Sequence, residues 1–201
     1  MLTVYGHAKS RAVRTLWMLG ELGIAYTHKD FLPRSPGTQT PEFKALNPNA
    51  RVPVIDDDGF ILSESMAINF YLAKKHQSPL LPADPKIEAL VLQWSLWETD
   101  RLDRQIVNHA RHTSDLPAAE RKPELAREAW NECVAAFDVL EATLRKSEWL
   151  AGASFTLADL NVAAALFRAL AVDMGKWPKT QAWLKRCWDR PAAQKAKAMR
   201  G

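Results

Sequence analysis

The sequence predicts a mixed α/β domain followed by an all-helical domain, and three observations carry this prediction. Residues 1–76 alternate short strand patterns with helical patterns. Residues 77–85 (QSPLLPADP) contain three prolines in nine positions, which is typical of a domain boundary. No strand pattern follows this proline-rich segment. We therefore expect an α/β domain at 1–76, a linker at 77–85 and an all-α domain at 86–201.

The first domain is expected to have the element order β-α-β-α-β-β-α. Its strands are short apolar runs, and its helices repeat apolar residues every three or four positions. A right-handed first βαβ unit and a final antiparallel hairpin would give a small mixed sheet flanked by helices. The expected strands are 2–5, 25–31 and the two arms of a hairpin at 52–62, and the expected helices are 42–46, 64–76 and a first one that opens at Ser10 and stops at Gly23.

The second domain is expected to be helical throughout. Its strongest signal is FTLADL (155–160), where Thr156 can cap a helix and Asp159 can bond back to it. The helix that follows, to about Val172, is apolar nearly all round, which predicts that it is buried at the centre of the domain. The other expected helices are 86–112, 123–146, 178–188 and 192–199.

The composition is that of an ordinary globular protein, with 47% hydrophobic and 25% charged residues and a net charge of +4. Basic residues gather only near the end of the chain, and no nucleic-acid motif accompanies them. A solvated terminal helix is therefore favoured over a nucleic-acid partner. The basic residues in question are Lys185, Arg186, Arg190, Lys195, Lys197 and Arg200.

The two cysteines, Cys133 and Cys187, predict reduced core thiols rather than chemistry. They form no CxxC motif and have no metal-ligand spacing with histidine, so we expect no metal site. The chain also lacks a signal-peptide pattern and an apolar run of membrane length. These features predict a cytoplasmic protein with no membrane partner.

Pro53 stands just inside the third strand, where a residue without an N–H interrupts the hydrogen-bond ladder. Taken alone, it is explained equally well by a trans proline on an edge strand and by a cis proline in a tight turn. The residues around it decide between these interpretations.

Together, these motifs resemble those of the glutathione transferase family, and the resemblance covers essentially the whole chain. It implies a thioredoxin-like fold for the first domain and a cis peptide bond before Pro53. The motifs are Ser10 with Arg14, Asn47-Pro48 with Arg51-Val52-Pro53, Glu64-Ser65, and Gly152 with Thr156 and Asp159.

The resemblance also implies a binding site for glutathione. The backbone of Val52, freed from the sheet by Pro53, would pair with the cysteinyl unit of glutathione, as in strand addition. Ser65, at a helix start, would hold the γ-glutamyl carboxylate with help from Glu64. Gln39 and Arg51 would lie towards the glycyl end, although Arg51 replaces the glutamine that is common there.

Ser10 is the expected catalytic residue, because the resemblance is closest to the serine-type classes. A free cysteine thiol has a pKa near 8.5, and a lowering by about 2 units would make the thiolate its main form at neutral pH. A hydroxyl that donates to the sulfur at a helix start favours this anion. Tyr5, at the end of the first strand, is the competitor, since other classes of the family use a tyrosine.

Two further candidates are His7 and Asp100. His7 could contact the substrate, although an exposed loop histidine is the simpler interpretation. Asp100 falls where some relatives supply an acid to the γ-glutamyl amine bound by the neighbouring subunit, although a surface ion pair is the simpler interpretation.

The sequence thus predicts a glutathione transferase that joins the glutathione thiolate to a hydrophobic electrophile, as in detoxification. Glutathione would be a co-substrate, no cofactor is expected, and the resemblance implies a homodimer. Two alternatives stay open: a glutathione-dependent peroxidase or oxidoreductase on the same fold, and a non-catalytic protein that binds glutathione or hydrophobic ligands. The absence of phosphate-binding glycine motifs argues against a nucleotide-binding domain.

Overall fold

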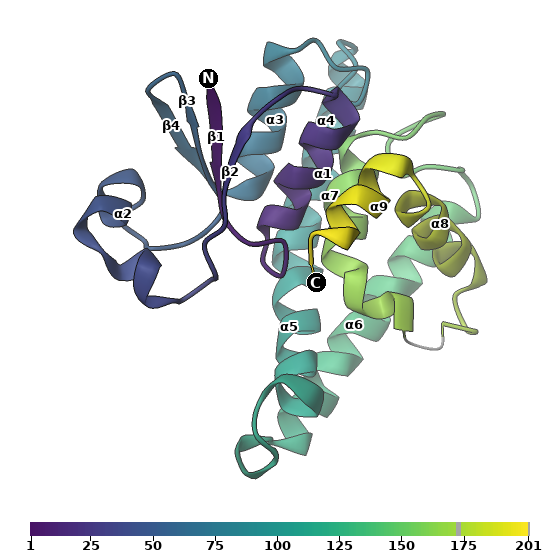
Figure 1. The fold of residues 1–201 in the computed structure, drawn as a ribbon. Helices are drawn as coiled ribbons and strands as arrows, with labels where there is room; N and C mark the ends of the chain where they lie inside the picture. The colour runs from purple at the N-terminus through teal and green to yellow at the C-terminus, as the bar shows by residue number, and fades with distance from the viewer. Residues whose placement is uncertain (172–173, 201) are drawn as a thin grey trace. The chain divides into compact units, whose positions relative to one another are not determined.

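The computed structural model of the protein describes residues 1–171 and 174–200 (Figure 1). The chain forms two compact units, one made of residues 1–81 with 189–201 and the other of residues 82–188. The end of the chain thus packs with its beginning. The division into domains at 1–76 and 86–201 stays a prediction.

The first unit is built on a four-stranded mixed sheet with the strand order β2-β1-β3-β4. Strand β1 pairs in parallel with β2 and antiparallel with β3, and β3 pairs antiparallel with β4. The predicted mixed sheet is therefore confirmed. The strands are β1 (Leu2–Tyr5), β2 (Thr27–Lys29), β3 (Val54–Asp57) and β4 (Phe60–Ser63).

Three helices of this unit follow the predicted order, and α1 packs against α3. Helix α1 ends at Gly23, which adopts the left-handed conformation with φ of 65°. The helices are α1 (Ala12–Leu22), α2 (Pro41–Leu46) and α3 (Ser65–Lys75), and a 3-10 turn spans Pro36–Gln39.

Three predicted boundaries were wrong, each for a local reason. Strand β2 is only Thr27–Lys29, because these are the residues that pair with β1. Helix α1 begins at Ala12, because Ser10 lies in a turn that its hydroxyl stabilises. Strand β3 begins at Val54, directly after the proline that interrupts the ladder.

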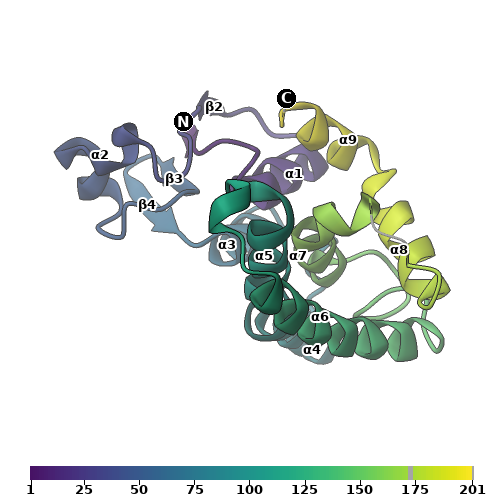
Figure 2. The same ribbon diagram turned by 90° about the horizontal axis from the view of Figure 1, so that it is seen from below.

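The second unit contains one long helical stretch, residues 85–115, which confirms the single helix predicted at 86–112. Helix α4 (Pro85–Glu98) passes through a π-helical turn at 99–103 into α5 (Arg104–Ala110), and a second π-helical turn follows at 111–115. Figure 2 shows α5 side by side with α6 (Pro123–Leu144).

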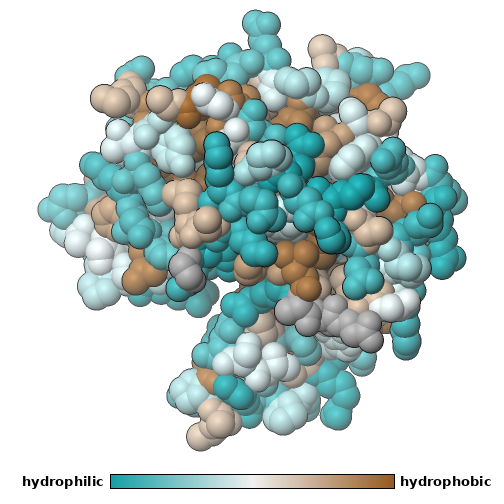
Figure 3. Space-filling view, turned by 45° about the vertical axis from the view of Figure 1, so that its right-hand side comes forward, coloured by the Kyte–Doolittle hydropathy of each residue, from teal (hydrophilic) through white to brown (hydrophobic). Residues whose placement is uncertain are grey.

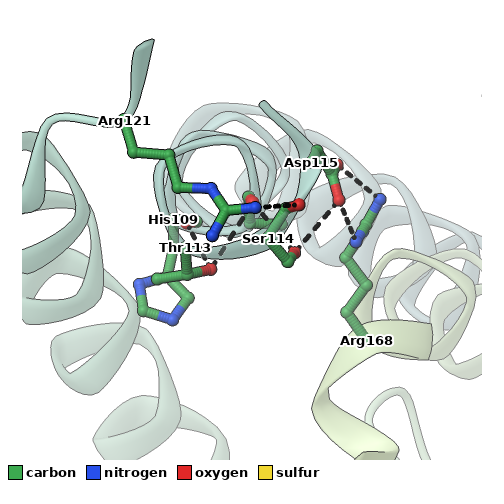
Figure 4. A network of polar contacts seen from close by, with 7 residues as sticks. His109, Thr113, Ser114, Asp115, Arg121 and Arg168 are labelled. Atoms are coloured by element: carbon green, nitrogen blue, oxygen red, sulfur yellow. Dashed lines mark hydrogen bonds and ion pairs between the residues drawn. The ribbon is translucent and has the colours of Figure 1, made fainter. Parts of the chain in front are cut away.

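Polar contacts stabilise the C-terminal end of the helical stretch 85–115 (Figure 4). Arg121 donates to the main-chain oxygen of Ser114 at 2.9 Å, where a helix end has carbonyls without intrahelical donors. Arg168, in the 3-10 segment after α7, makes a two-point ion pair with Asp115 at 3.0 and 2.8 Å. These contacts join the end of the stretch to the segment that follows the central helix.

Helix α7 (Leu157–Ala165) is the predicted centre of the second unit, and each of its residues is buried. The predicted capping box is present between Thr156 and Asp159. Asp159 also accepts hydrogen bonds from the Leu150 amide at 2.9 Å and from the Trp183 indole at 2.8 Å. After Ala165 the chain changes to the 3-10 segment, and the predicted end at Val172 lies outside the described residues.

The remaining helices are α8 (Pro178–Trp188) in the second unit and α9 (Pro191–Ala198) in the first. Cys133 and Cys187 are buried, and neither forms a disulfide. No helix of the described residues is both long and apolar enough to cross a membrane. Within the same residues, no group of three or more His, Cys, Asp or Glu side chains could hold a metal ion.

Candidate functional site

The loop between β1 and α1 is held by the strand β2 and the residues after it. The Gly6 amide donates to the Lys29 carbonyl, and the His7 amide donates to the Phe31 carbonyl, each at 2.9 Å. A ring nitrogen of His28 lies 2.7 Å from the Gly6 carbonyl oxygen. The first half of the loop is therefore fixed by backbone contacts.

Gly6 allows the loop to approach two other segments. Its φ of 144° is rare for a residue with a side chain. A Cβ atom added there would lie 2.9 Å from the Cβ of Ala12 and 3.1 Å from that of Val52. The start of α1 and the Pro53 turn thus meet at this glycine. Gly6 was not predicted as a site residue, although a glycine directly after a strand was the available signal.

Ser10 lies in this loop, just ahead of α1, and is half-buried. Its hydroxyl donates to the His7 carbonyl at 2.7 Å and accepts from the Ala12 amide at 3.1 Å. The amide polarises the hydroxyl and makes it a better donor. A rotation about the C–O bond would turn its hydrogen from the carbonyl to a ligand atom.

Val52 offers the free backbone that the sequence predicts. The Val52–Pro53 peptide bond is cis, which confirms the cis interpretation of Pro53. The ladder between β1 and β3 ends at the pair Tyr5–Val54. Within the described parts of the chain, the N–H and C=O of Val52 make no hydrogen bond, so an extended ligand could pair with both.

Ser65 is the first residue of α3 and is 6% exposed. Its hydroxyl accepts a hydrogen bond at 3.3 Å from Arg14, whose side chain is also buried. A helix start with a guanidinium beside it suits an anion. Arg14, named above only as one of the motif residues, lies on α1, and its side chain reaches the start of α3.

Glu64, directly before Ser65, has an unusual backbone conformation, with φ of 70° and ψ of 110°. A non-glycine residue with positive φ is strained, and such residues cluster at functional sites. Its side chain is exposed, and its carbonyl accepts from the Ile68 amide at 2.9 Å. This conformation turns the chain from β4 into α3.

Gln39 and Arg51 both lie in the first unit with exposed side chains. Gln39 ends the 3-10 turn and donates to the Thr38 hydroxyl at 3.4 Å. The carbonyl of Arg51 accepts from the Asn47 side chain at 2.9 Å, which fixes the backbone ahead of Val52. Among the described residues, the Arg51 guanidinium forms no ion pair that would keep it from a ligand.

His7 was expected to be an exposed loop residue, but its side chain is only 16% exposed. Its Nδ1 accepts a hydrogen bond from the Lys9 amide at 2.8 Å. Its Nε2 lies 3.9 Å from a carboxylate oxygen of Asp30. The histidine therefore shapes the turn that contains Ser10, and the interpretation as an exposed loop residue was wrong.

Neither Tyr5 nor Asp100 lies in the loop that contains Ser10. Tyr5 is buried in an aromatic cluster, with its ring centroid 6.0 Å from that of Phe31 and 6.3 Å from that of Phe43. Asp100 lies in the second unit on the π-helical turn, where it forms an exposed ion pair with Arg101 at 2.9 Å. The expected surface pair is thus present.

A groove of about 480 Å³ lies between α5 and α6 in the second unit. Most of the residues that line it have polar side chains, and the apolar electrophile pocket that the resemblance implies stays a prediction. The groove is lined by Gln105, Asn108, His112, Leu125, Glu128, Ala129 and Glu132.

Comparison with known proteins places this site in a family context. The family described as "Glutathione S-transferase, N-terminal domain" matches residues 1–74, and "Glutathione S-transferase, C-terminal domain" matches residues 97–191. The chain is 30% identical to glutathione S-transferase GstB of Escherichia coli K12, with 97% of each chain covered. It is 28% identical to glutathione S-transferase D7 of Drosophila melanogaster, with 92% of this chain and 83% of the relative covered.

Solved structures agree with this result. A theta class glutathione S-transferase from Xanthomonas axonopodis pv. citri, crystallised with glutathione bound, superposes with a TM-score of 0.91. It is 30% identical over 97% of this chain and 96% of that chain. The fold is therefore shared with proteins of known structure.

Proposed function

Because the chain belongs to the glutathione S-transferase family, we propose that it is a glutathione transferase whose Ser10 hydroxyl stabilises the thiolate of bound glutathione. The observation that carries the proposal is the position of that hydroxyl. It stands just ahead of α1, it is polarised by the Ala12 amide, and it lies in the loop that meets Val52 at Gly6.

Glutathione would bind along the first unit as an extended peptide. The free N–H and C=O of Val52 would pair with its cysteinyl residue, and the start of α3 at Ser65 would hold its γ-glutamyl carboxylate. Glu64 would help to orient that end, and Gln39 and Arg51 would contact the glycyl end. This placement brings the sulfur towards the positive end of α1.

The reaction would be attack of the thiolate on an electrophilic carbon of a hydrophobic second substrate. The thiol proton leaves to solvent, and the thiolate forms a carbon–sulfur bond. In a substitution, a leaving group departs with its electron pair. In an addition, the π bond of an activated double bond breaks and its electron pair takes up a proton. Ser10 favours the thiolate by donating to the sulfur. Glutathione is consumed as a co-substrate, and the proposal needs no cofactor.

A disulfide route through a protein cysteine is not favoured. Cys133 is fully buried, and burial, with a smaller contribution from Glu132, raises the pKa of its thiol to about 12. Cys187 is buried as well. Buried thiols without a disulfide also support the proposed cytoplasmic location.

Conjugation assays test the proposal against both alternatives. Purified protein is supplied with glutathione and an activated aryl halide, and thioether formation is measured. We expect turnover by wild type and a loss of about 10- to 100-fold in kcat/KM for Ser10→Ala, because less thiolate is present. Glutathione disulfide formed from an organic hydroperoxide without conjugation would favour the peroxidase, and tight glutathione binding without either product would favour the binding protein.

A further inference from the structure

Helix α9, near the end of the chain, packs against α1, the helix that follows Ser10. The ribbon views show α9 beside α1 from two directions (Figures 1 and 2). The approach is close, because a Cβ atom added at Gly20 would lie 3.0 Å from the Cβ of Ala192. The end of the chain thus forms part of the unit proposed to bind glutathione.

A shielded ion pair anchors the start of α9. Arg190 binds Glu21 of α1 through two contacts of 2.7 Å each, and the Glu21 side chain is only 10% exposed. The Trp17 indole also donates to Glu21, at 2.9 Å. A pair that is largely out of water is costly to break from one side, because the remaining charge stays without its partner.

Arg200 extends this anchoring to the loop that contains Ser10. Its Nη1 donates to the carbonyl oxygen of Ala8 at 2.6 Å, although the two residues lie 192 positions apart in the chain. Ala8 is 1% exposed. A hydrogen bond from a charged guanidinium to a buried carbonyl is stronger than one between neutral groups.

The Ala8 carbonyl lies in the middle of the turn that sets the Ser10 hydroxyl. On one side is His7, whose carbonyl accepts the Ser10 hydroxyl at 2.7 Å, and on the other is Lys9, whose amide donates to the His7 ring at 2.8 Å. Backbone hydrogen bonds from Lys29 and Phe31, at and after the end of β2, hold Gly6 and His7. Arg200 therefore holds the second half of the loop, from the opposite end of the chain.

We propose that Arg200 is a positioning residue for the thiolate site, which fixes the turn from His7 to Ser10 so that the hydroxyl faces the sulfur. The inference rests on the proposed role of Ser10. It also separates the basic residues of the tail by function: Arg190 and Arg200 hold the first unit together, whereas Lys197 is exposed on α9.

Two measurements on the full chain test this inference, with Arg200→Ala as the variant. Lys197→Ala is the matched control, because it removes the same charge from the same tail. In unliganded protein, amide hydrogen exchange in the loop after β1 should become at least about tenfold faster in Arg200→Ala and stay unchanged in the control. The pKa of the bound glutathione thiol should rise by about 0.5–1 unit, which is a threefold to tenfold loss of thiolate at acidic pH. Arg200→Lys, which keeps a charged donor, should restore part of both effects.

Each outcome is decisive. Equal exchange rates and equal thiol pKa values in Arg200→Ala and Lys197→Ala overturn the proposal. Faster exchange with an unchanged thiol pKa overturns it too, because the contact would then be structural only. If wild type does not bind glutathione, the proposed function fails, while the exchange rates still show whether Arg200 fixes the loop.

Discussion

Gly6 is the single residue whose replacement should damage the site most directly. In Gly6→Ala, the new Cβ would meet the Cβ atoms of Ala12 and Val52 at 2.9 and 3.1 Å, so the loop, the start of α1 or the Pro53 turn must shift. We expect a loss of about 1–3 kcal/mol in the free energy of unfolding, together with weaker glutathione binding. Urea denaturation and isothermal titration calorimetry measure the two effects.

Gly59→Ala is the matched control for this change. Gly59 also has a positive φ, of 91°, but an added Cβ there meets nothing within 4 Å. It should therefore cost stability through the backbone alone and leave the affinity for glutathione unchanged. Equal losses of affinity in the two variants would contradict the account of Gly6.

Asp57 should make stability depend on pH. Hydrogen bonds from Lys75 and then Tyr71 hold the pKa of this carboxyl below its ordinary value. A lowered folded-state pKa means that the stabilisation is present above the unfolded pKa of about 3.9 and is lost as the pH falls through the folded value. Asp57→Asn should thus be less stable than wild type at pH 7, and the gap should close in acid.

Urea midpoints measured from neutral to acidic pH check this prediction, with Glu148→Gln as the control for an exposed carboxylate. A gap between Asp57→Asn and wild type that stays constant into acid would show that the hydrogen bonds do not favour the ionised form.

At the residue scale, some features of the candidate site could be predicted from the sequence and others could not. The cis bond before Pro53 could be predicted, because the neighbouring motifs narrow the interpretation of one proline. The positive φ of Glu64 and the contact of Arg14 with Ser65 could not, because the first belongs to the turn from β4 into α3 and the second needs α1 to pack against α3. His7 was misjudged because its contact with the Lys9 amide exists only once the turn has formed.

The capping box of α7 should carry much of the stability of the second unit. Asp159 is fully buried and accepts from Leu150, Thr156 and Trp183. Asp159→Ala removes the acceptor and leaves these buried donors without partners, so we expect a loss of several kcal/mol in the free energy of unfolding. Thr156→Ala removes only the cap and should cost about 1 kcal/mol.

Differential scanning calorimetry compares the two variants. Glutathione affinity, measured well below either melting temperature, should equal that of wild type, because the capping box lies in the second unit. A smaller loss for Asp159→Ala than for Thr156→Ala would contradict the importance given to the carboxylate network.

At the element scale, local signals were the reliable ones. The FTLADL start signal, the stop at Gly23 and the long periodic stretch at 85–115 are local patterns, and each was found in the expected place. Strand ends were less predictable, because pairing with a neighbour decides where β2 begins and ends. The π-helical turns within the long stretch left no recognisable signal in its sequence.

At the scale of the whole molecule, the packing of α9 with the first unit could not be predicted. The contacts between Arg190 and Glu21 and between Arg200 and Ala8 join residues 169 and 192 positions apart. The basic residues of the tail do not show in the sequence which distant residues they will contact. The sequence therefore predicted the helix, but the expected domain division groups it with residues 86–201, whereas α9 packs with the first unit.

The homodimer that the family resemblance implies also belongs to this scale. Leu92 and Leu96 lie one turn apart on α4 and are 47% and 61% exposed, which provides an apolar strip for a second copy. On the face drawn in Figure 3, by comparison, hydrophobic residues form small groups among hydrophilic ones. We expect wild type to be a dimer by multi-angle light scattering and the double variant Leu92→Asp, Leu96→Asp to be a monomer.

Val139→Asp is the control for this test, because Val139 is 45% exposed on α6 and the substitution places an aspartate on an exposed apolar site of another helix. It should remain dimeric. A double variant with the mass of wild type would remove the α4 strip as the proposed interface.

The most direct test of the central claim is the ionisation of glutathione bound to the protein, followed by the ultraviolet absorbance of its thiolate. We predict a pKa near or below neutral in wild type, a rise of about 1–2 units in Ser10→Ala and no substantial change in Tyr5→Phe. A larger rise in Tyr5→Phe than in Ser10→Ala would contradict the account and assign the thiolate to the tyrosine.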